Sequence, residues 1–248
     1  MRRSRSLSLL LTLLVLSACA EPVAEKPEAP RLPADLSTKM IFKSYLGHGF
    51  AEQDVYVEDV PGSDHVVRFE NRQLANPEKM AKAFQRRVMT STTARAHDPY
   101  KKDKSWQGPF PKGKSLGVAL QAWSNSQGVG RYTVKDGTAT VLMDFWKMMR
   151  GGTYSLWCIR MSENSIIEKP CNEPGKPGNP VVMDNRGETR LEVSFPALAD
   201  TTSGTGSWIG LAYHSDGHQH AIENDFGKTT HMQLLWKLPT PSELKPAY

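Results

Sequence analysis

The 248-residue sequence has no apolar run of the roughly 20 residues that a membrane-spanning helix requires. Its longest apolar stretch, Leu7 to Leu16, is interrupted by Ser8 and Thr12 and is too short to cross a bilayer. This stretch follows a basic start with arginines at positions 2, 3 and 5, which is the composition of a secretory signal. We therefore expect the remainder of the chain to be soluble.

The sequence also lacks the common short catalytic motifs. It contains no glycine-rich phosphate-binding loop, no G-x-S-x-G elbow and no H-E-x-x-H zinc motif. Aspartate and glutamate residues are scattered, and no facing pair of carboxylates can be placed from the sequence. Serine, histidine and aspartate could be combined into a triad on paper, but almost any chain allows this. We therefore expect a non-catalytic protein rather than an enzyme.

Cysteine is scarce, with three residues in the chain, and the first of them lies three positions after the end of the apolar stretch. The tetrapeptide Leu16-Ser17-Ala18-Cys19 resembles the lipobox of bacterial lipoproteins, in which small residues precede the cysteine. The resemblance covers only this segment. It implies that residues 1–18 are a signal peptide and that the sulfur of Cys19 carries a lipid. The alternative is an ordinary secreted protein that is cleaved elsewhere.

The lipobox resemblance also implies a location. Several acyl chains, at about 0.8 kcal/mol per buried methylene, hold a protein stably on a membrane. Ala20 rather than aspartate in the second mature position favours the outer membrane. Cleavage would remove three arginines and lower the formal charge of +5 to about +2, so nucleic acid is not an expected partner. The expected partners are the membrane itself and an envelope protein or polymer.

The two remaining cysteines, Cys158 and Cys171, form a natural pair in an oxidising compartment. A disulfide that closes this short loop would contribute roughly 3 kcal/mol in the chain-entropy model. The alternative is a redox-active or metal-binding thiol pair. Because the spacing is not C-x-x-C, the sequence favours a structural bridge.

Composition divides the mature chain into two parts. Residues 19–38 contain closely spaced prolines among charges and alanines, which hold a backbone extended and predict a tether. Residues 39–248 are expected to form a single domain of many short strands separated by turns. The clearest hairpin turn is Asp136-Gly137, because these residue types tolerate positive φ. The expected strands cover residues 55–57, 66–69, 116–122, 131–134, 139–145, 153–159, 181–183, 190–195, 207–214 and 231–238.

Many strands without βαβ alternation predict a mainly β fold, an antiparallel β-sandwich of the Ig-like or jelly-roll-like kind. One short helix is expected near residues 77–89. Asn76-Pro77-Glu78 supplies a capping side chain, a proline in the first turn and an acid near the helix start. Met80, Phe84 and Val88 then recur at four-residue spacing, which indicates one apolar face.

A long basic loop is expected at residues 90–115. Its cations are Arg95, Lys101, Lys102, Lys104, Lys112 and Lys114. Three aromatic residues, Tyr100, Trp106 and Phe110, are interspersed among them and are candidates for binding a partner. Loops of this length are often functional. The alternative is a solvated crossover whose aromatic side chains cover the edge of the core.

Four of the seven histidines, His214, His218, His220 and His231, fall within 18 residues. In an extended strand His218 and His220 would point to the same face, with Cα atoms about 7 Å apart. Together with His214 or His231 they could give the three nitrogens that bind copper or zinc. The alternative is that these are structural or surface histidines around an ordinary Ser-Asp-Gly turn.

Parts of residues 106–238 resemble exported bacterial β-sandwich domains that have no established activity. The segments that carry the resemblance are residues 108–113 (GPFPKG), 152–158 (GTYSLWC), 212–217 (AYHSDG) and 226–227 (FG) with 230–234 (THMQL). The resemblance implies one sandwich in which His214 and His231 lie near each other, and it carries over no functional residue. Residues before 100 do not share it.

Two functions are consistent with these patterns. The first is a membrane-anchored envelope lipoprotein that acts as a non-catalytic binding or structural module. The second is an envelope protein that binds copper or zinc through the histidine-rich segment.

The lipid anchor is directly testable by mass spectrometry of the protein isolated from its native membrane. We expect an amino terminus at Cys19 with a mass increase that matches a diacylglycerol group and an added acyl chain. A Cys19→Ser variant should lack this mass increase and should be recovered in the soluble fraction without detergent. An intact leader, or a Cys19 terminus without fatty chains, would contradict the anchor.

Overall fold

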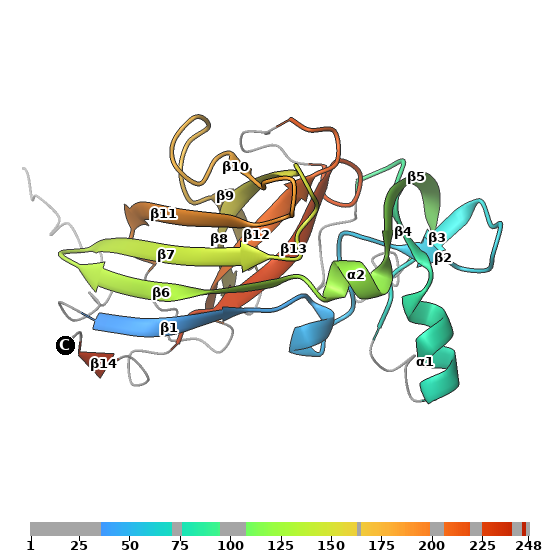
Figure 1. Cartoon of the computed structure of the whole chain (residues 1–248), viewed down its shortest axis with the longest axis horizontal. Helices are drawn as coiled ribbons and strands as arrows, with labels where there is room; N and C mark the ends of the chain where they lie inside the picture. The colour runs from blue at the N-terminus through green and yellow to red at the C-terminus, as the bar shows by residue number, and fades with distance from the viewer. Residues whose placement is uncertain are drawn as a thin grey trace, which may run out of the picture.

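The computed structural model describes residues 36–70, 76–94, 108–162, 165–198, 206–218, 225–239 and 245–246. These residues form three antiparallel β-sheets, and the third lies at one end of the other two (Figure 1). The prediction of a mainly β fold with antiparallel sheets is confirmed, and the packing of the first two sheets is that of a sandwich. Cys19 and most of the expected tether lie outside the described residues.

The first sheet has the strand order β11-β7-β6-β1-β14. Its strands are β1 (Leu36–Phe42), β6 (Gln127–Lys135), β7 (Thr138–Trp146), β11 (Thr189–Pro196) and β14 (Lys245–Pro246). The β6–β7 hairpin turns at Asp136 and Gly137, which have φ values of 49° and 75°, as the sequence predicted. Leu36 pairs with Val134, so β1 begins beside this hairpin, at the end of the sandwich opposite the third sheet (Figure 1).

The second sheet has the order β10-β8-β12-β13, and β9 also pairs with β8. Its strands are β8 (Thr153–Ser162), β9 (Ser165–Pro170), β10 (Val181–Val182), β12 (Ser207–His214) and β13 (Thr230–Lys237). Lys43 and Leu235 exchange backbone hydrogen bonds of 2.9 and 2.7 Å, which join the chain after β1 to the edge of β13. The two sheets are therefore linked at this corner.

The third sheet is smaller and has the order β2-β3-β5-β4. Its strands are β2 (Val57–Glu58), β3 (His65–Val67), β4 (Arg87–Ser91) and β5 (Phe110–Ala119). The helix α1 (Pro77–Phe84) precedes β4, and α2 (Leu120–Ser124) follows β5. A short 3-10 helix, η1 (Leu46–His48), lies on the path from β1 to this sheet.

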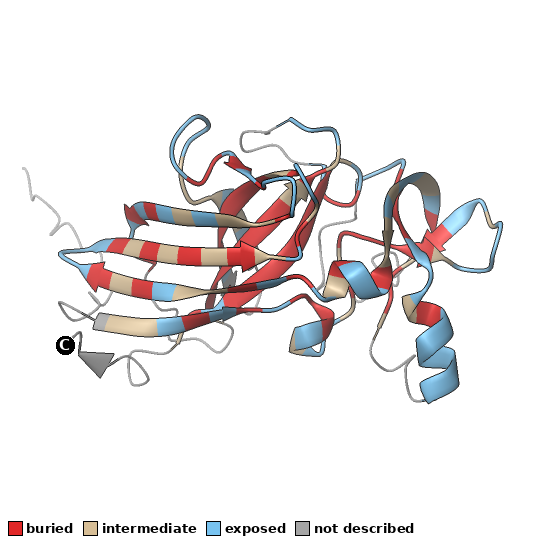
Figure 2. Cartoon of the chain, viewed as in Figure 1, coloured by how far each residue is buried: buried red, intermediate tan, exposed pale blue. Residues whose placement is uncertain are grey.

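The core follows the alternation of the strands. In β7 every second residue is buried, from Ala139 to Phe145, and Figure 2 shows this alternation along the strand. In β12 nearly every residue is buried, because both faces of the second sheet are covered. One face packs against the first sheet through residues such as Leu211 and Leu156, and the other packs against Tyr45 and Phe226.

The predicted helix is correct at its start and wrong at its end. The Asn76 side chain accepts hydrogen bonds from the amides of Glu78 and Lys79 at 2.9 and 3.2 Å, which is the expected cap. The helix ends at Phe84 rather than residue 89, because Arg87–Ser91 pairs with β5 instead. A second helix, α2, occupies residues for which the sequence predicted a strand.

The expected loop at 90–115 and the expected tether also need correction. β4 extends into this loop and β5 begins within it at Phe110, so its ends are strands. Residues 95–107 lie outside the described part of the chain. The predicted tether reaches residue 38, but β1 already begins at Leu36 and pairs with β6.

Cys158 and Cys171 form a disulfide with a Cα–Cα distance of 4.9 Å. Cys158 lies in β8 and is buried in the sandwich core, while Cys171 directly follows β9. The bridge therefore fastens the β8–β9 hairpin at its open end. In the described residues no helix is long and apolar enough to span a membrane.

Replacing both cysteines by alanine should lower the free energy of unfolding by about 2–4 kcal/mol, because the unfolded chain gains the freedom that the bridge removes. Urea denaturation monitored by tryptophan fluorescence measures this difference. The matched control is the wild-type protein in reductant, which should show a similar loss. An unchanged unfolding free energy in both would contradict a stabilising bridge.

Candidate functional site

Two of the histidines that were expected to share a metal, His214 and His231, face apart in the structure. Tyr213 pairs with His231 across β12 and β13, and His214 pairs with Thr230. Because consecutive side chains of a strand point to opposite faces, His214 and His231 project from opposite faces of the second sheet. The two residues are thus near each other along the sheet, as the resemblance implied, but their imidazoles face apart.

His231 is completely buried at the boundary between the sandwich and the third sheet. Its Nδ1 lies 2.7 Å from the carbonyl oxygen of Asp54, and its Nε2 lies 2.9 Å from the hydroxyl of Ser215. Since a carbonyl oxygen only accepts, Nδ1 donates to Asp54. Burial lowers the pKa of His231 to about 4, so the ring is neutral near pH 7.

His214 is equally buried, on the other face. Its Nε2 lies 2.7 Å from the hydroxyl oxygen of Ser155, which also accepts a hydrogen bond of 2.7 Å from the indole nitrogen of Trp157. Its Nδ1 lies 3.4 Å from the hydroxyl of Thr230. Both ring nitrogens therefore have protein partners, which is the behaviour of a structural histidine.

The other two histidines of the segment are placed differently. His218 is exposed, in the turn after β12, and its backbone amide donates to the carboxylate of Asp216. His220 lies outside the described residues. Within the described ranges no three His, Cys, Asp or Glu side chains are close enough to hold a metal ion.

Phe110 was expected to contact a partner, but the structure places it in the core of the third sheet. It is only 6% exposed, its ring packs 4.9 Å from that of Tyr56, and the guanidinium of Arg68 lies 5.4 Å above it. Tyr100 and Trp106 lie outside the described residues. Lys112, two positions further along β5, is partly exposed instead.

Lys112 lines a hollow of about 440 Å³ on the third sheet. The other lining residues are Glu58, Pro61, Arg86, Arg87, Met89 and Ser115. Arg86 and Arg87 are exposed and lie between the end of α1 and the start of β4. This hollow therefore holds three cations against a single carboxylate.

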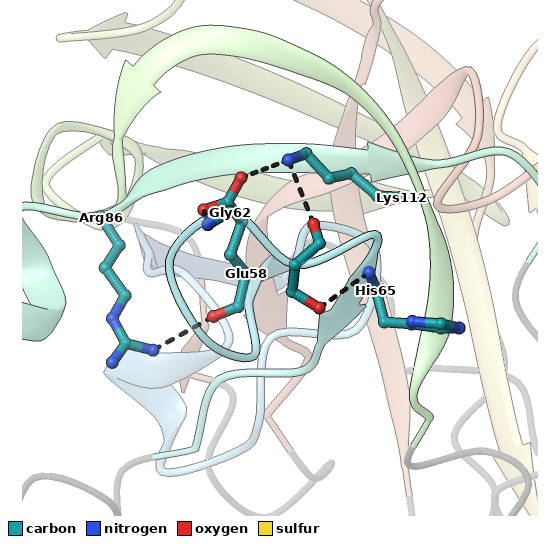
Figure 3. A network of polar contacts seen from close by, with 6 residues as sticks. Glu58, Gly62, His65, Arg86 and Lys112 are labelled. Atoms are coloured by element: carbon teal, nitrogen blue, oxygen red, sulfur yellow. Dashed lines mark hydrogen bonds and ion pairs between the residues drawn. The ribbon is translucent and has the colours of Figure 1, made fainter.

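The carboxylate in the hollow is held by several donors (Figure 3). The Lys112 amino group donates to the Glu58 carboxylate and, at 3.2 Å, to the carbonyl of Ser63. The amide of Gly62 donates to the second carboxylate oxygen of Glu58 at 2.9 Å. The Lys112 hydrogen bond is the largest cause that lowers the pKa of Glu58. Glu58 is thus ionised and matched by Lys112, which leaves the charges of Arg86 and Arg87 in excess.

A second hollow of about 390 Å³ lies next to the first, and Arg86 lines both of them. It is lined by Lys79, Lys82 and Arg86 together with Asp59, over a floor that includes Val57 and Phe69. The two hollows together are called the cationic groove below. They present five cations, Lys79, Lys82, Arg86, Arg87 and Lys112, against the two carboxylates of Glu58 and Asp59.

A third hollow, beside the disulfide, is larger but is not enriched in one charge. It measures about 710 Å³, and its charged lining residues are Glu173, Glu192 and Lys176. The cationic groove is therefore the hollow that favours a ligand of one charge, an anion. Sequence reasoning missed Arg86 and Arg87 because it placed them inside a helix, where they would have been ordinary surface residues.

Two buried carboxyl groups lie where the third sheet meets the sandwich. Asp54 accepts a hydrogen bond of 3.0 Å from the amide of Met232, at the edge of β13. Glu52 is completely buried, and the amide of Leu46 donates to it at 3.4 Å. Burial raises the pKa of Glu52 to about 8, and the nearby charge of Asp54 adds to this effect. Glu52 is therefore protonated near pH 7.

No family model, no curated protein and no solved structure matches this chain. The site must therefore be interpreted from its own geometry.

Glu52 gives a pH dependence of stability with a definite sign. Between its ordinary pKa of 4.5 and its folded-state pKa of about 8, the folded state binds a proton that the unfolded state has lost. The free energy of unfolding should therefore decrease as the pH rises through this window, by at most about 1.4 kcal/mol per pH unit. The contribution of His231 has the opposite sign and lies below its ordinary pKa of 6.5, where stability falls as the pH falls.

Thermal unfolding between pH 7 and 8, above the range in which His231 contributes most, singles out Glu52. We expect the wild-type Tm to fall across this range and the Tm of Glu52→Gln, which imitates the neutral acid, to stay nearly constant. Glu58→Gln is the matched control, because the hydrogen bond from Lys112 lowers the pKa of Glu58 and keeps its carboxylate ionised throughout the range; this variant should keep the wild-type slope. A Glu52→Gln variant with an unchanged slope would show that another group titrates.

Proposed function

We propose that the chain is a membrane-anchored binding module of the bacterial envelope, and that the cationic groove captures an anionic partner. The single observation that carries the proposal is the excess of positive charge in two adjoining hollows. Lys112 already matches Glu58, so a partner that enters the groove meets Arg86 and Arg87 without displacing that ion pair.

The spread of the charges determines the kind of partner. Five cations along two hollows suit a chain of repeated negative charges better than a single small anion. Each exposed ion pair contributes only about 0.2–1 kcal/mol, so useful affinity requires several contacts at once. The partner class is therefore a polyanion, an envelope polymer or an acidic protein segment that carries carboxylates or phosphates.

Arginine suits this role because its planar guanidinium can hold a carboxylate or a phosphate with two parallel hydrogen bonds. Arg87 has no ion pair within the described ranges, and the Arg86 guanidinium donates to the backbone carbonyl of Glu58 at 3.2 Å, which orients it without neutralising it. The anchor at Cys19 and the location in the envelope belong to the same proposal and rest on the sequence alone.

The groove can be tested with two polyanions of matched length, polyglutamate and polyphosphate, each carrying a fluorophore. We expect Arg86→Ala/Arg87→Ala to weaken binding about tenfold, the loss of two contacts of roughly 0.5–1 kcal/mol each. Binding should also weaken steeply with salt. The polymer that binds more tightly distinguishes phosphate from carboxylate recognition.

The matched control removes the same charge from exposed positions of β6, with Arg131→Ala/Lys135→Ala. This control should bind like the wild type. Equal losses in both double variants would mean that only net charge matters, and the groove would then have no special role. Circular dichroism should show that both variants remain folded.

A further inference from the structure

The described residues contain two serine–histidine pairs at hydrogen-bond distance, and they differ in access. In the first pair both Ser155 and His214 are buried, with exposures of 0% and 1%. In the second pair His231 is buried, but Ser215 is partly exposed in the turn that follows β12. Ser215 is therefore the more accessible of the two serine residues.

The hydrogen bonds of His231 fix the tautomer that a general base requires. Nδ1 donates to the Asp54 carbonyl, and the low pKa of the ring means that Nε2 carries no proton near pH 7. Because Nε2 carries no proton, its 2.9 Å contact with Ser215 uses the proton of the serine hydroxyl. The same hydroxyl lies 3.2 Å from the Thr229 carbonyl oxygen, so Nε2 is the nearer of its two acceptors. A serine hydroxyl that donates to an imidazole whose other nitrogen is held by an acceptor is the arrangement of an activated nucleophile.

The surroundings hold the pair in place. The Ser215 amide donates to the Thr229 carbonyl at 2.8 Å, which fixes the backbone of the serine at the end of the strand pair. Tyr213 lies two positions earlier on β12 and hence on the same face, and its ring packs 6.2 Å from that of His231. The half-exposed Tyr213 thus forms part of the wall beside the serine.

We propose that Ser215 is a nucleophile activated by His231 and that it accepts an acyl group from a carboxylic ester. The Ser215 oxygen attacks the ester carbonyl carbon, and its proton moves to Nε2 of His231. The C–O bond to the alcohol then breaks, and His231 gives the proton to the departing oxygen. Water attacks the acyl-serine in the same manner and releases the carboxylic acid, so no oxidant or further reactant is needed.

Two features of the environment of His231 should make the reaction of Ser215 slow. The third member is a backbone carbonyl instead of a carboxylate, so it orients the imidazole but gives the imidazolium less charge stabilisation than an aspartate would. Burial also lowers the pKa of His231, and an imidazole with a lower pKa is a weaker base for the serine proton. We therefore expect reaction over minutes to hours with activated reagents, and only slow turnover of unactivated esters.

A fluorophosphonate probe tests the nucleophile in the full-length protein. The Ser215 oxygen should form a bond to phosphorus while fluoride leaves, and peptide mass spectrometry should place the adduct on Ser215 and not on Ser155. The Ser215→Ala variant should lose the adduct, and circular dichroism should show that it remains folded. An unlabelled Ser215 in the wild-type protein, under conditions that label a serine esterase added to the same tube, would overturn the proposal.

The role of His231 requires a second comparison. His231→Asn places an amide donor near the Nδ1 position but removes the Nε2 acceptor, and it should slow labelling at least about 100-fold. His214→Asn is the matched control, because it alters a buried histidine of the same sheet without touching Ser215, and it should label like the wild type. Labelling of His231→Asn at the wild-type rate would show that Ser215 is not activated by this histidine.

This activity is independent of the cationic groove. Polyanion binding should be unaffected in Ser215→Ala, and serine labelling should be unaffected in Arg86→Ala/Arg87→Ala. Failure of one proposal therefore leaves the other testable.

Discussion

The contact between Asp54 and strand β13 is the constraint on which the arrangement of the molecule depends. β13 is an edge strand of the second sheet, and its outward amide at Met232 would otherwise lack a partner in a buried position. The Asp54 carboxylate accepts this amide, and its backbone carbonyl accepts from His231. Asp54 thereby pairs the Met232 amide at the edge of β13, joins the third sheet to the sandwich and sets the tautomer of a buried imidazole.

Local sequence signals predicted those parts of the fold whose cause is local. The Asp136-Gly137 turn and the Asn76 cap depend on neighbouring residues and were found. The end of α1 was not, because Val88 continues the apolar spacing of a helix while its segment gains more by pairing with β5, a partner distant in the sequence. The same long-range pairing turned the ends of the expected basic loop into strands.

The candidate site shows a similar division. His214 and His231 are close in the sequence but face apart, because His231 lies opposite Tyr213 on the neighbouring strand, and Tyr213 and His214 point to opposite faces of the sheet. The groove, in contrast, joins Lys112 of β5 to Glu58 of β2 and Arg86 after α1, three elements whose proximity no spacing rule reveals. The sequence indicated a basic region near Lys112 but not the residues that complete it.

The starting point of β1 has a consequence for how an anchored chain would meet its surroundings. Because Leu36 lies beside the β6–β7 hairpin, a leader attached before it enters the molecule at the pole opposite the third sheet (Figure 1). The cationic groove, which lies on the third sheet, is therefore at the other end of the molecule from the point where such a tether joins the sandwich.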